Sequence, residues 1–110
     1  MILHGYAIYD RKGMHYHAPF FAVADGAAVR SFMDLANDPS TTVGRHPGDY
    51  VLYRVGGFDD ASGLLLAVGA VEHVSDAEAL VRVAPSLPFD QKPVASTRAS
   101  DLSTNGTGKE

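Results

Sequence analysis

The sequence predicts an α+β fold: a small antiparallel β-sheet in the order β-β-α-β-β, with one helix packed on one face. Residues 2–9 and 49–58 are rich in β-branched and aromatic side chains, which is typical of strands. Between them, apolar residues recur at three- and four-residue spacing across 28–36, which is typical of a helix with one buried stripe. The 110 residues, 45% of them hydrophobic, suit one domain with a modest core.

The first strand, 2–9, runs into the polar turn "DRKG", and "MHYHAPFFAVA" at 14–24 can return as a second strand. Pro19 cannot donate a hydrogen bond within a sheet, so we expect this strand to be short or to lie at an edge. Asp25 is a good N-cap for the helix, because its carboxylate can accept a hydrogen bond from a free backbone N–H. The helix should end before Pro39, since the residue preceding a proline avoids helical angles.

The second half of the domain is predicted to be a hairpin. Residues 40–48 contain two glycines and a proline and indicate an ordered loop. The strand 49–58 is followed by a turn, "DDASG", and by a long strand at 64–74. A short helical turn is expected at Asp76 to Arg82, capped by Ser75 or Asp76.

The composition changes at Pro85. Residues 85–110 contain three prolines, many serines and threonines, and few large apolar residues. Such a segment buries too little surface to offset the entropy of ordering, so we predict a flexible tail after an α+β domain at 1–84.

Composition also excludes several classes of protein. The absence of cysteine excludes disulfides, thiolate zinc sites and cysteine nucleophiles. No apolar run approaches the roughly 20 residues that span a bilayer, and the start of the chain lacks the pattern of a secretory signal. The formal net charge of −4 argues against a protein that simply coats nucleic acid, so contact with DNA would need a local basic patch.

No catalytic set is visible. The chain shows no serine–histidine–acid pattern, and "GRHPGD" lacks the G-K-[ST] ending of a phosphate-binding loop. Asp59 and Asp60 lie at the mouth of the predicted hairpin, where aspartate commonly bonds to the backbone. We therefore expect neither an enzyme nor a cofactor.

His15 and His17 are two residues apart and share one face if they lie on a strand. This spacing is compatible with two metal ligands, with His4, His73 or an aspartate as a third. We expect instead a solvated pair beside a turn, and no metal site.

The segment "DYVLYRV" alternates two sets of side chains. We predict that Val51, Tyr53 and Val55 face the core and that Tyr50 and Arg54 lie together on the open face of the sheet. A tyrosine beside an arginine can stack on a base and pair with a phosphate; cross-strand packing of amphipathic side chains is the alternative. The only other clustered positive groups are Arg45 and His46 in the predicted loop, and Arg11 and Lys12 in the first turn.

Three segments together resemble the small non-structural protein of gokushovirus-type microviruses, which are bacteriophages with circular single-stranded DNA genomes. They are "YAIYDRKGMHYHAPFFA" at 6–22, "DGAAVRSFMDLANDP" at 25–39 and "GRHPGDYVLYRVGGFD" at 44–59. The last follows a G-[KR]-H-P-x-D-[YF]-x-L-[YF]-x-[ILV]-G-x-[FY]-D signature. The resemblance covers roughly residues 1–75 and does not extend into the tail.

The resemblance implies an accessory protein of the host cytoplasm that binds single-stranded DNA or the replication machinery, and so supports genome synthesis or packaging. In this hypothesis the protein is a homodimer, Tyr50 and Arg54 form the stacking and phosphate pair, and Arg45, His46, Arg11 and Lys12 guide the DNA backbone. The alternative is a non-enzymatic module that contacts capsid, scaffold or a host factor without binding DNA, and that is associated with the virion.

Overall fold

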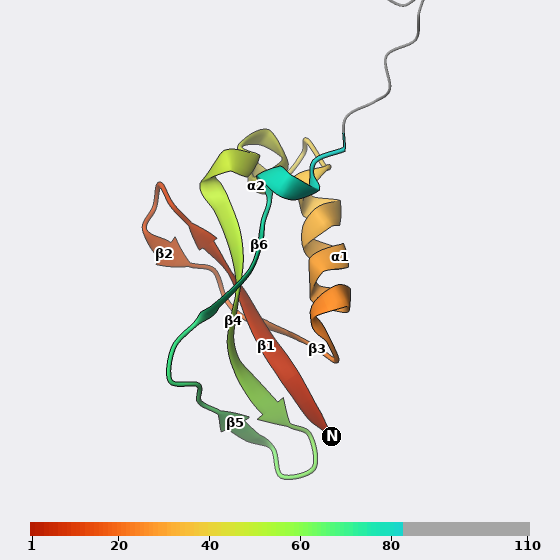
Figure 1. Ribbon diagram of the computed structural model, residues 1–110, viewed down its shortest axis with the longest axis vertical. Helices are drawn as coiled ribbons and strands as arrows, with labels where there is room; N and C mark the ends of the chain where they lie inside the picture. The colour runs from red at the N-terminus through yellow and green to blue at the C-terminus, as the bar shows by residue number, and fades with distance from the viewer. Residues whose placement is uncertain (83–110) are drawn as a thin grey trace, which may run out of the picture.

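Two long strands form the centre of the structure. The computed structural model describes residues 1–82, in which β1 (Ile2–Asp10) runs antiparallel to β4 (Tyr50–Asp59) (Figure 1). The strand order is β2-β1-β4-β5, with β3 also paired to β1 and β6 also paired to β4. One long helix packs on one face, so the predicted α+β class is confirmed. The tail predicted at 85–110, and the last two residues of the predicted domain, lie outside the described residues.

The second strand is divided into two short pieces. β2 (His15–Tyr16) pairs with the end of β1, and β3 (Phe20–Ala22) pairs with its middle. Pro19 lies between the two pieces, at the point where a continuous ladder would require its missing N–H. The expectation of a short edge strand is therefore confirmed, although 14–24 is not one continuous strand.

The last strand is divided in the same way, so the prediction of one strand at 64–74 is wrong. β5 (Leu64–Leu66) forms the predicted hairpin with β4, and β6 (Glu72–Asp76) pairs farther along β4. At the break, a Cβ on Gly56 would lie only 2.7 Å from the carbonyl oxygen of Leu66. The end of β5 therefore passes so close to β4 that only glycine fits at position 56. After Leu66 the chain leaves the sheet.

A bulge in β4 coincides with this break. The register between β1 and β4 shifts after Gly5, which pairs with Gly56, so that the next pair is Tyr6 with Arg54. Val55 is consequently an extra residue in β4 without a partner in β1. Such a bulge bends a strand and increases its local twist.

Two further corrections concern short helices. The predicted loop at 40–48 contains the helix α2 (Thr42–Arg45), and a single 3₁₀ turn, η1 (Pro47–Asp49), follows it. The side-chain oxygen of Thr41 accepts a hydrogen bond from the backbone N–H of Gly44 at 3.0 Å, which starts α2. The helical turn expected near the C-terminal end is present as η2 (Glu78–Leu80), but it follows Ala77 and has no side-chain cap.

Helix α1 (Asp25–Ala36) begins after Ala24, which offers no side-chain cap, so Asp25 is not the N-cap. The carboxylate of Asp25 instead accepts a hydrogen bond from the Tyr6 hydroxyl at 2.6 Å and lies 3.3 Å from the guanidinium of Arg54. The predicted cap is wrong because these side chains of the sheet compete for the carboxylate. They tie the start of α1 to β1 and β4.

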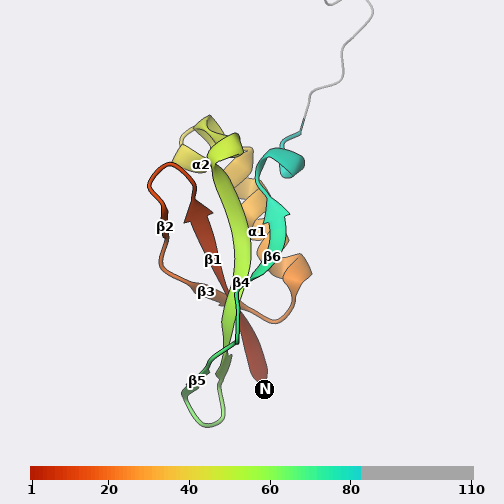
Figure 2. The same ribbon diagram turned by 60° about the vertical axis from the view of Figure 1, so that its left-hand side comes forward.

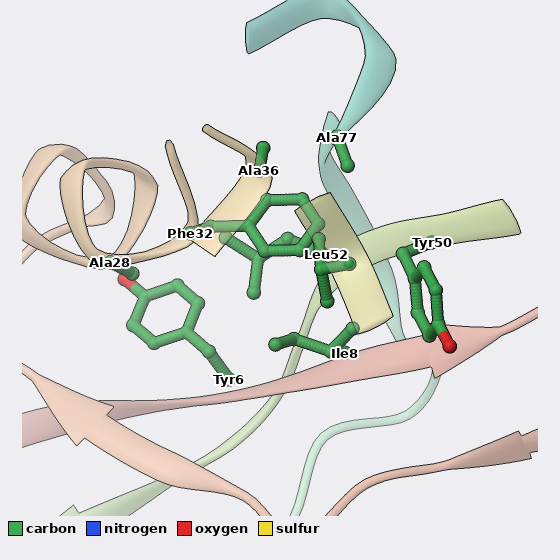
Figure 3. Close-up of a cluster of buried hydrophobic side chains, with 9 residues drawn as sticks. Tyr6, Ile8, Ala28, Phe32, Ala36, Tyr50, Leu52 and Ala77 are labelled. Atoms are coloured by element: carbon green, nitrogen blue, oxygen red, sulfur yellow. The ribbon is translucent and has the colours of Figure 1, made fainter. Parts of the chain in front are cut away.

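The core lies between α1 and one face of the central strands, and no helix within residues 1–82 covers the opposite face (Figures 1 and 2). Figure 3 shows the ring of Phe32 over Leu52, beside side chains of both central strands. The buried cluster comprises Tyr6, Ile8, Ala28, Phe32, Ala36, Val43, Tyr50, Leu52 and Ala77. Tyr50 and Leu52 thus face the helix, and the predicted assignment of the faces of β4 is wrong.

The wrong assignment has a physical origin at Val51. This residue is as well buried as Leu52, with 1% of its surface exposed, although it lies on the face away from α1. Both faces of β4 are therefore apolar near its start, and alternation alone does not tell them apart.

We expect Phe32→Ala to lower the free energy of unfolding by about 3–5 kcal/mol, because it removes a fully buried ring from the centre of the core. Phe21→Ala is the matched control. Since 41% of Phe21 is exposed, this substitution should cost about 1 kcal/mol or less. Urea unfolding followed by circular dichroism measures both; equal losses would contradict the location of the core.

A second prediction concerns pH. Burial and the hydrogen bond to Asp25 raise the pKa of the Tyr6 hydroxyl to about 12, from 10.0 in an unfolded chain. Because the folded state holds this proton more tightly, its stabilising contribution is complete below pH 10 and is lost as the pH rises towards 12. Tyr6→Phe should lower the free energy of unfolding by about 1.5–3 kcal/mol at pH 7 and should reduce the alkaline loss.

Urea unfolding at pH 7 and at pH 11 tests this prediction. Tyr16→Phe serves as the control, because 43% of Tyr16 is exposed and its hydroxyl does not bond to Asp25. If Tyr6→Phe and the unmodified chain lost the same free energy between the two pH values, the coupling of Tyr6 to Asp25 would be refuted.

Candidate functional site

The face of the sheet opposite α1 carries a cluster of four aromatic side chains, which we call the aromatic face: Tyr9, Tyr16, Tyr53 and His73. Their ring centroids lie 4.7 Å apart for Tyr9 and Tyr16, 5.8 Å for Tyr16 and Tyr53, and 6.0 Å for Tyr53 and His73. Tyr9 and Tyr53 also meet edge to face at 6.3 Å. These are the separations at which aromatic rings attract one another.

Strand pairing explains why these rings meet. Tyr9 is directly opposite Tyr16, and Tyr53 is directly opposite His73. In an antiparallel sheet, directly opposed residues point to the same face. Tyr9 and Tyr53 alternate with the core residues Ile8 and Leu52 and therefore point away from α1.

The aromatic face is accessible. Tyr16 is exposed over 43% of its surface, and Tyr9 and Tyr53 are half-buried. Side chains of this kind expose a flat apolar surface that can stack on another planar group, while neighbouring rings fix their orientation. The arrangement is therefore suited to bind planar ligands by stacking.

Two of the predicted cationic residues lie at one end of this face, in the turn between β1 and β2. Arg11 donates a hydrogen bond to the carbonyl oxygen of Gly48 at 3.1 Å, and its guanidinium lies 3.7 Å from the carboxylate of Asp76. The same carboxylate lies 2.9 Å from Nε2 of His73. Asp76 thus connects Arg11 to a ring of the aromatic face, and the exposed Lys12 follows Arg11 in the turn.

The predicted pair of Tyr50 and Arg54 is not on this face. Only 8% of Tyr50 is exposed, because its side chain is part of the core below α1, so its ring cannot stack on a base. Arg54 lies 3.3 Å from Asp25 and 3.3 Å from Glu72. Two carboxylates already neutralise it, which leaves little attraction for a phosphate.

Arg45 and His46 are exposed at the end of α2. The guanidinium of Arg45 donates to the carbonyl oxygens of Ser40, at 3.1 Å, and Pro39, at 3.5 Å, and so closes the preceding loop. Among the six residues predicted from the sequence, Arg11 and Lys12 are the two that the structure places beside the aromatic face.

Sequence reasoning missed Tyr9, Tyr16 and Tyr53, although a signal for the first two was present. The turn "DRKG" follows Tyr9 closely, and a hairpin around it brings Tyr16 back opposite Tyr9. Tyr53 was predicted to face the core because the sequence pattern of β4 was assigned to the wrong faces of the sheet.

One group of residues within 1–82 has the side chains and spacing to hold a metal ion: Asp10, His15 and His17. They lie on the same hairpin as Tyr9 and Tyr16, but at alternate positions, so their side chains are on the opposite face of the hairpin. None of the helices in the described part of the chain is long and apolar enough to cross a membrane.

Comparison with known proteins gives one match. A family model described as "Phage ORF5 protein" matches residues 3–80, which is more than two thirds of the chain and covers the described elements from Leu3 in β1 to the end of η2. The chain matches no curated protein and no solved structure.

Proposed function

Because the chain belongs to the phage ORF5 protein family, we propose that it is a bacteriophage accessory protein that binds single-stranded DNA on its aromatic face. The observation that carries the proposal is the cluster of Tyr9, Tyr16 and Tyr53 on the open side of the sheet. The resemblance to proteins of microviruses supports a role in the synthesis or packaging of a single-stranded genome.

Stacking is the interaction that this face offers. Each base has a flat π-face, so stacking on a tyrosine tolerates any sequence and contributes about 1–3 kcal/mol per base. Bases in a duplex are already stacked on one another, whereas unpaired bases are free to insert between or over the rings. The aromatic face therefore favours single strands over duplexes.

The charges beside the aromatic face constrain how the DNA backbone lies. Arg11 and Lys12 are at the β1–β2 turn, where the carboxylate of Asp76 lies 3.7 Å from the guanidinium of Arg11, whereas Glu72 lies at the other end of β6 beside Arg54. Phosphates should therefore approach this face from the turn and avoid the carboxylates of Glu72 and Asp76. With a net charge of −4, and with Arg11 and Lys12 as the only cations of residues 1–82 assigned to this face, stacking rather than charge should supply most of the affinity.

The first test is a pair of substitutions at Tyr16. Tyr16→Ala removes the most exposed ring and should weaken binding to a labelled oligo-dT roughly 5- to 150-fold, which corresponds to about 1–3 kcal/mol. Tyr16→Phe keeps the ring and should change the affinity by no more than about twofold. Fluorescence anisotropy with single-stranded and duplex DNA measures both variants; binding that both substitutions leave unchanged would refute the proposal.

The second test is a salt titration. Two phosphate contacts predict that the logarithm of the affinity falls with the logarithm of salt concentration with a slope of about −1.4, and Arg11→Ala should reduce this slope by about 0.7. Arg30→Ala is the matched control, because Arg30 is exposed on α1, on the other side of the sheet. An equal change of slope in both variants would show that Arg11 does not contact a phosphate.

A second candidate function is supported by a different observation. The β4–β5 hairpin extends past the end of α1 (Figure 1) and exposes Leu64, Leu65 and Leu66 over 63%, 73% and 40% of their surfaces. Large exposed apolar patches commonly mark contacts between proteins. Here the partner would be a second copy of the chain, a replication protein or a capsid protein. Protein that does not bind oligo-dT but co-purifies with virions would favour this function.

A further inference from the structure

The β1–β2 hairpin brings three potential metal ligands together. One ligand atom each from Asp10, His15 and His17 lies within 4.8 Å of the other two. Asp10 is the last residue of β1 and pairs directly with His15 in β2. His17 follows β2, and its backbone N–H donates to the carbonyl oxygen of Ile8 at 2.8 Å, which holds it beside the same strand.

The turn fixes the carboxylate of Asp10. Its Oδ1 accepts hydrogen bonds from the backbone N–H groups of Lys12, at 2.9 Å, and Gly13, at 3.0 Å. These two bonds hold the carboxylate in place at the end of β1. Its second oxygen, Oδ2, is not used by these bonds.

Gly13 keeps the space beside two of the ligands open. A Cβ at this position would lie 2.7 Å from Nδ1 of His15 and 2.8 Å from Oδ2 of Asp10. Met14 then adopts a left-handed backbone with φ of 56°, unusual for a residue other than glycine, and its N–H bonds to the carbonyl oxygen of Asp10 at 2.7 Å. This turn returns the chain so that His15 lies opposite Asp10.

We propose that this hairpin binds a divalent transition-metal ion, with Zn²⁺ as the best match, through Asp10, His15 and His17. Two imidazole nitrogens and one carboxylate are a donor set that Zn²⁺ takes in proteins, with a fourth position left for water or a partner's ligand. Hard cations such as Mg²⁺ prefer oxygen ligands and should bind poorly.

The ligands need to move only a little. With metal–ligand bonds of about 2.0 Å, tetrahedral ligands lie about 3.3 Å apart, so no two ligand atoms need to approach each other by more than about 1.5 Å. His15 is exposed and His17 is half-buried, so rotation of their side chains can supply this movement. The ion would connect the end of β1 to the first residue of β2 and to the residue that follows β2. It would lie on the face of the hairpin opposite Tyr9 and Tyr16.

Isothermal titration of the full, untagged chain with ZnCl₂ tests the site. We expect one Zn²⁺ per chain, and His15→Ala and His17→Ala should each raise the dissociation constant about tenfold or more, because each removes one of three ligands. His46→Ala is the matched control, because His46 is exposed outside the cluster and should leave the affinity unchanged. Circular dichroism of each variant verifies its fold.

Gly13→Ala supplies a test that keeps all three ligands. The added methyl group would displace the ring of His15 and should also weaken Zn²⁺ binding. Titration with CoCl₂ adds a spectroscopic readout, since tetrahedral Co²⁺ absorbs strongly in the visible range. The proposal is overturned if the unmodified chain shows no saturable binding of Zn²⁺, or if His15→Ala and His17→Ala bind it as the unmodified chain does.

Discussion

The antiparallel pairing of β1 with β4 determines where every other part of the structure lies. It runs from Ile2 opposite Asp59 to Asp10 opposite Tyr50, and each of the four short strands pairs with one of these two. Because side chains alternate along a strand, a shift of this register by one residue would exchange the two faces. The same pairing therefore places Tyr6 and Leu52 under α1 and presents Tyr9 and Tyr53 on the other side.

The sequence predicts the elements better than their faces. The apolar stripe from Ala28 to Ala36 and the polar turns are local signals, so the helix and the β-β-α-β-β order could be read from them. The faces of β4 could not, because Val51 is buried on the side opposite Leu52. The cap at Asp25 failed for a related reason: its partners, Tyr6 and Arg54, come from distant positions in the chain, and local rules do not foresee them.

The two faces of the sheet differ in what their polar and aromatic side chains contact. On the helix side, Arg54 is held by Asp25 and Glu72, and the hydroxyl of Tyr6 bonds to the same Asp25. The charges in that network are already paired within the chain. The rings on the opposite side contact mainly one another, so a ligand can meet them without breaking a bond that holds the fold. This difference explains why the residues of β4 that the sequence singled out first, Tyr50 and Arg54, stabilise the domain.

The bulge at Val55 has a consequence for the shape of the open surface. Tyr53 and Phe58 are five positions apart, and in a regular strand an odd separation would place them on opposite sides. The extra residue restores them to one side: Tyr53 pairs with Ala7, Phe58 pairs with Leu3, and Phe58 meets the ring of Phe21 at 5.7 Å. One inserted residue thus places two groups of rings on the same side of the sheet. A relative that lacked the residue corresponding to Val55 would keep both groups of rings but would carry them on opposite faces of the sheet.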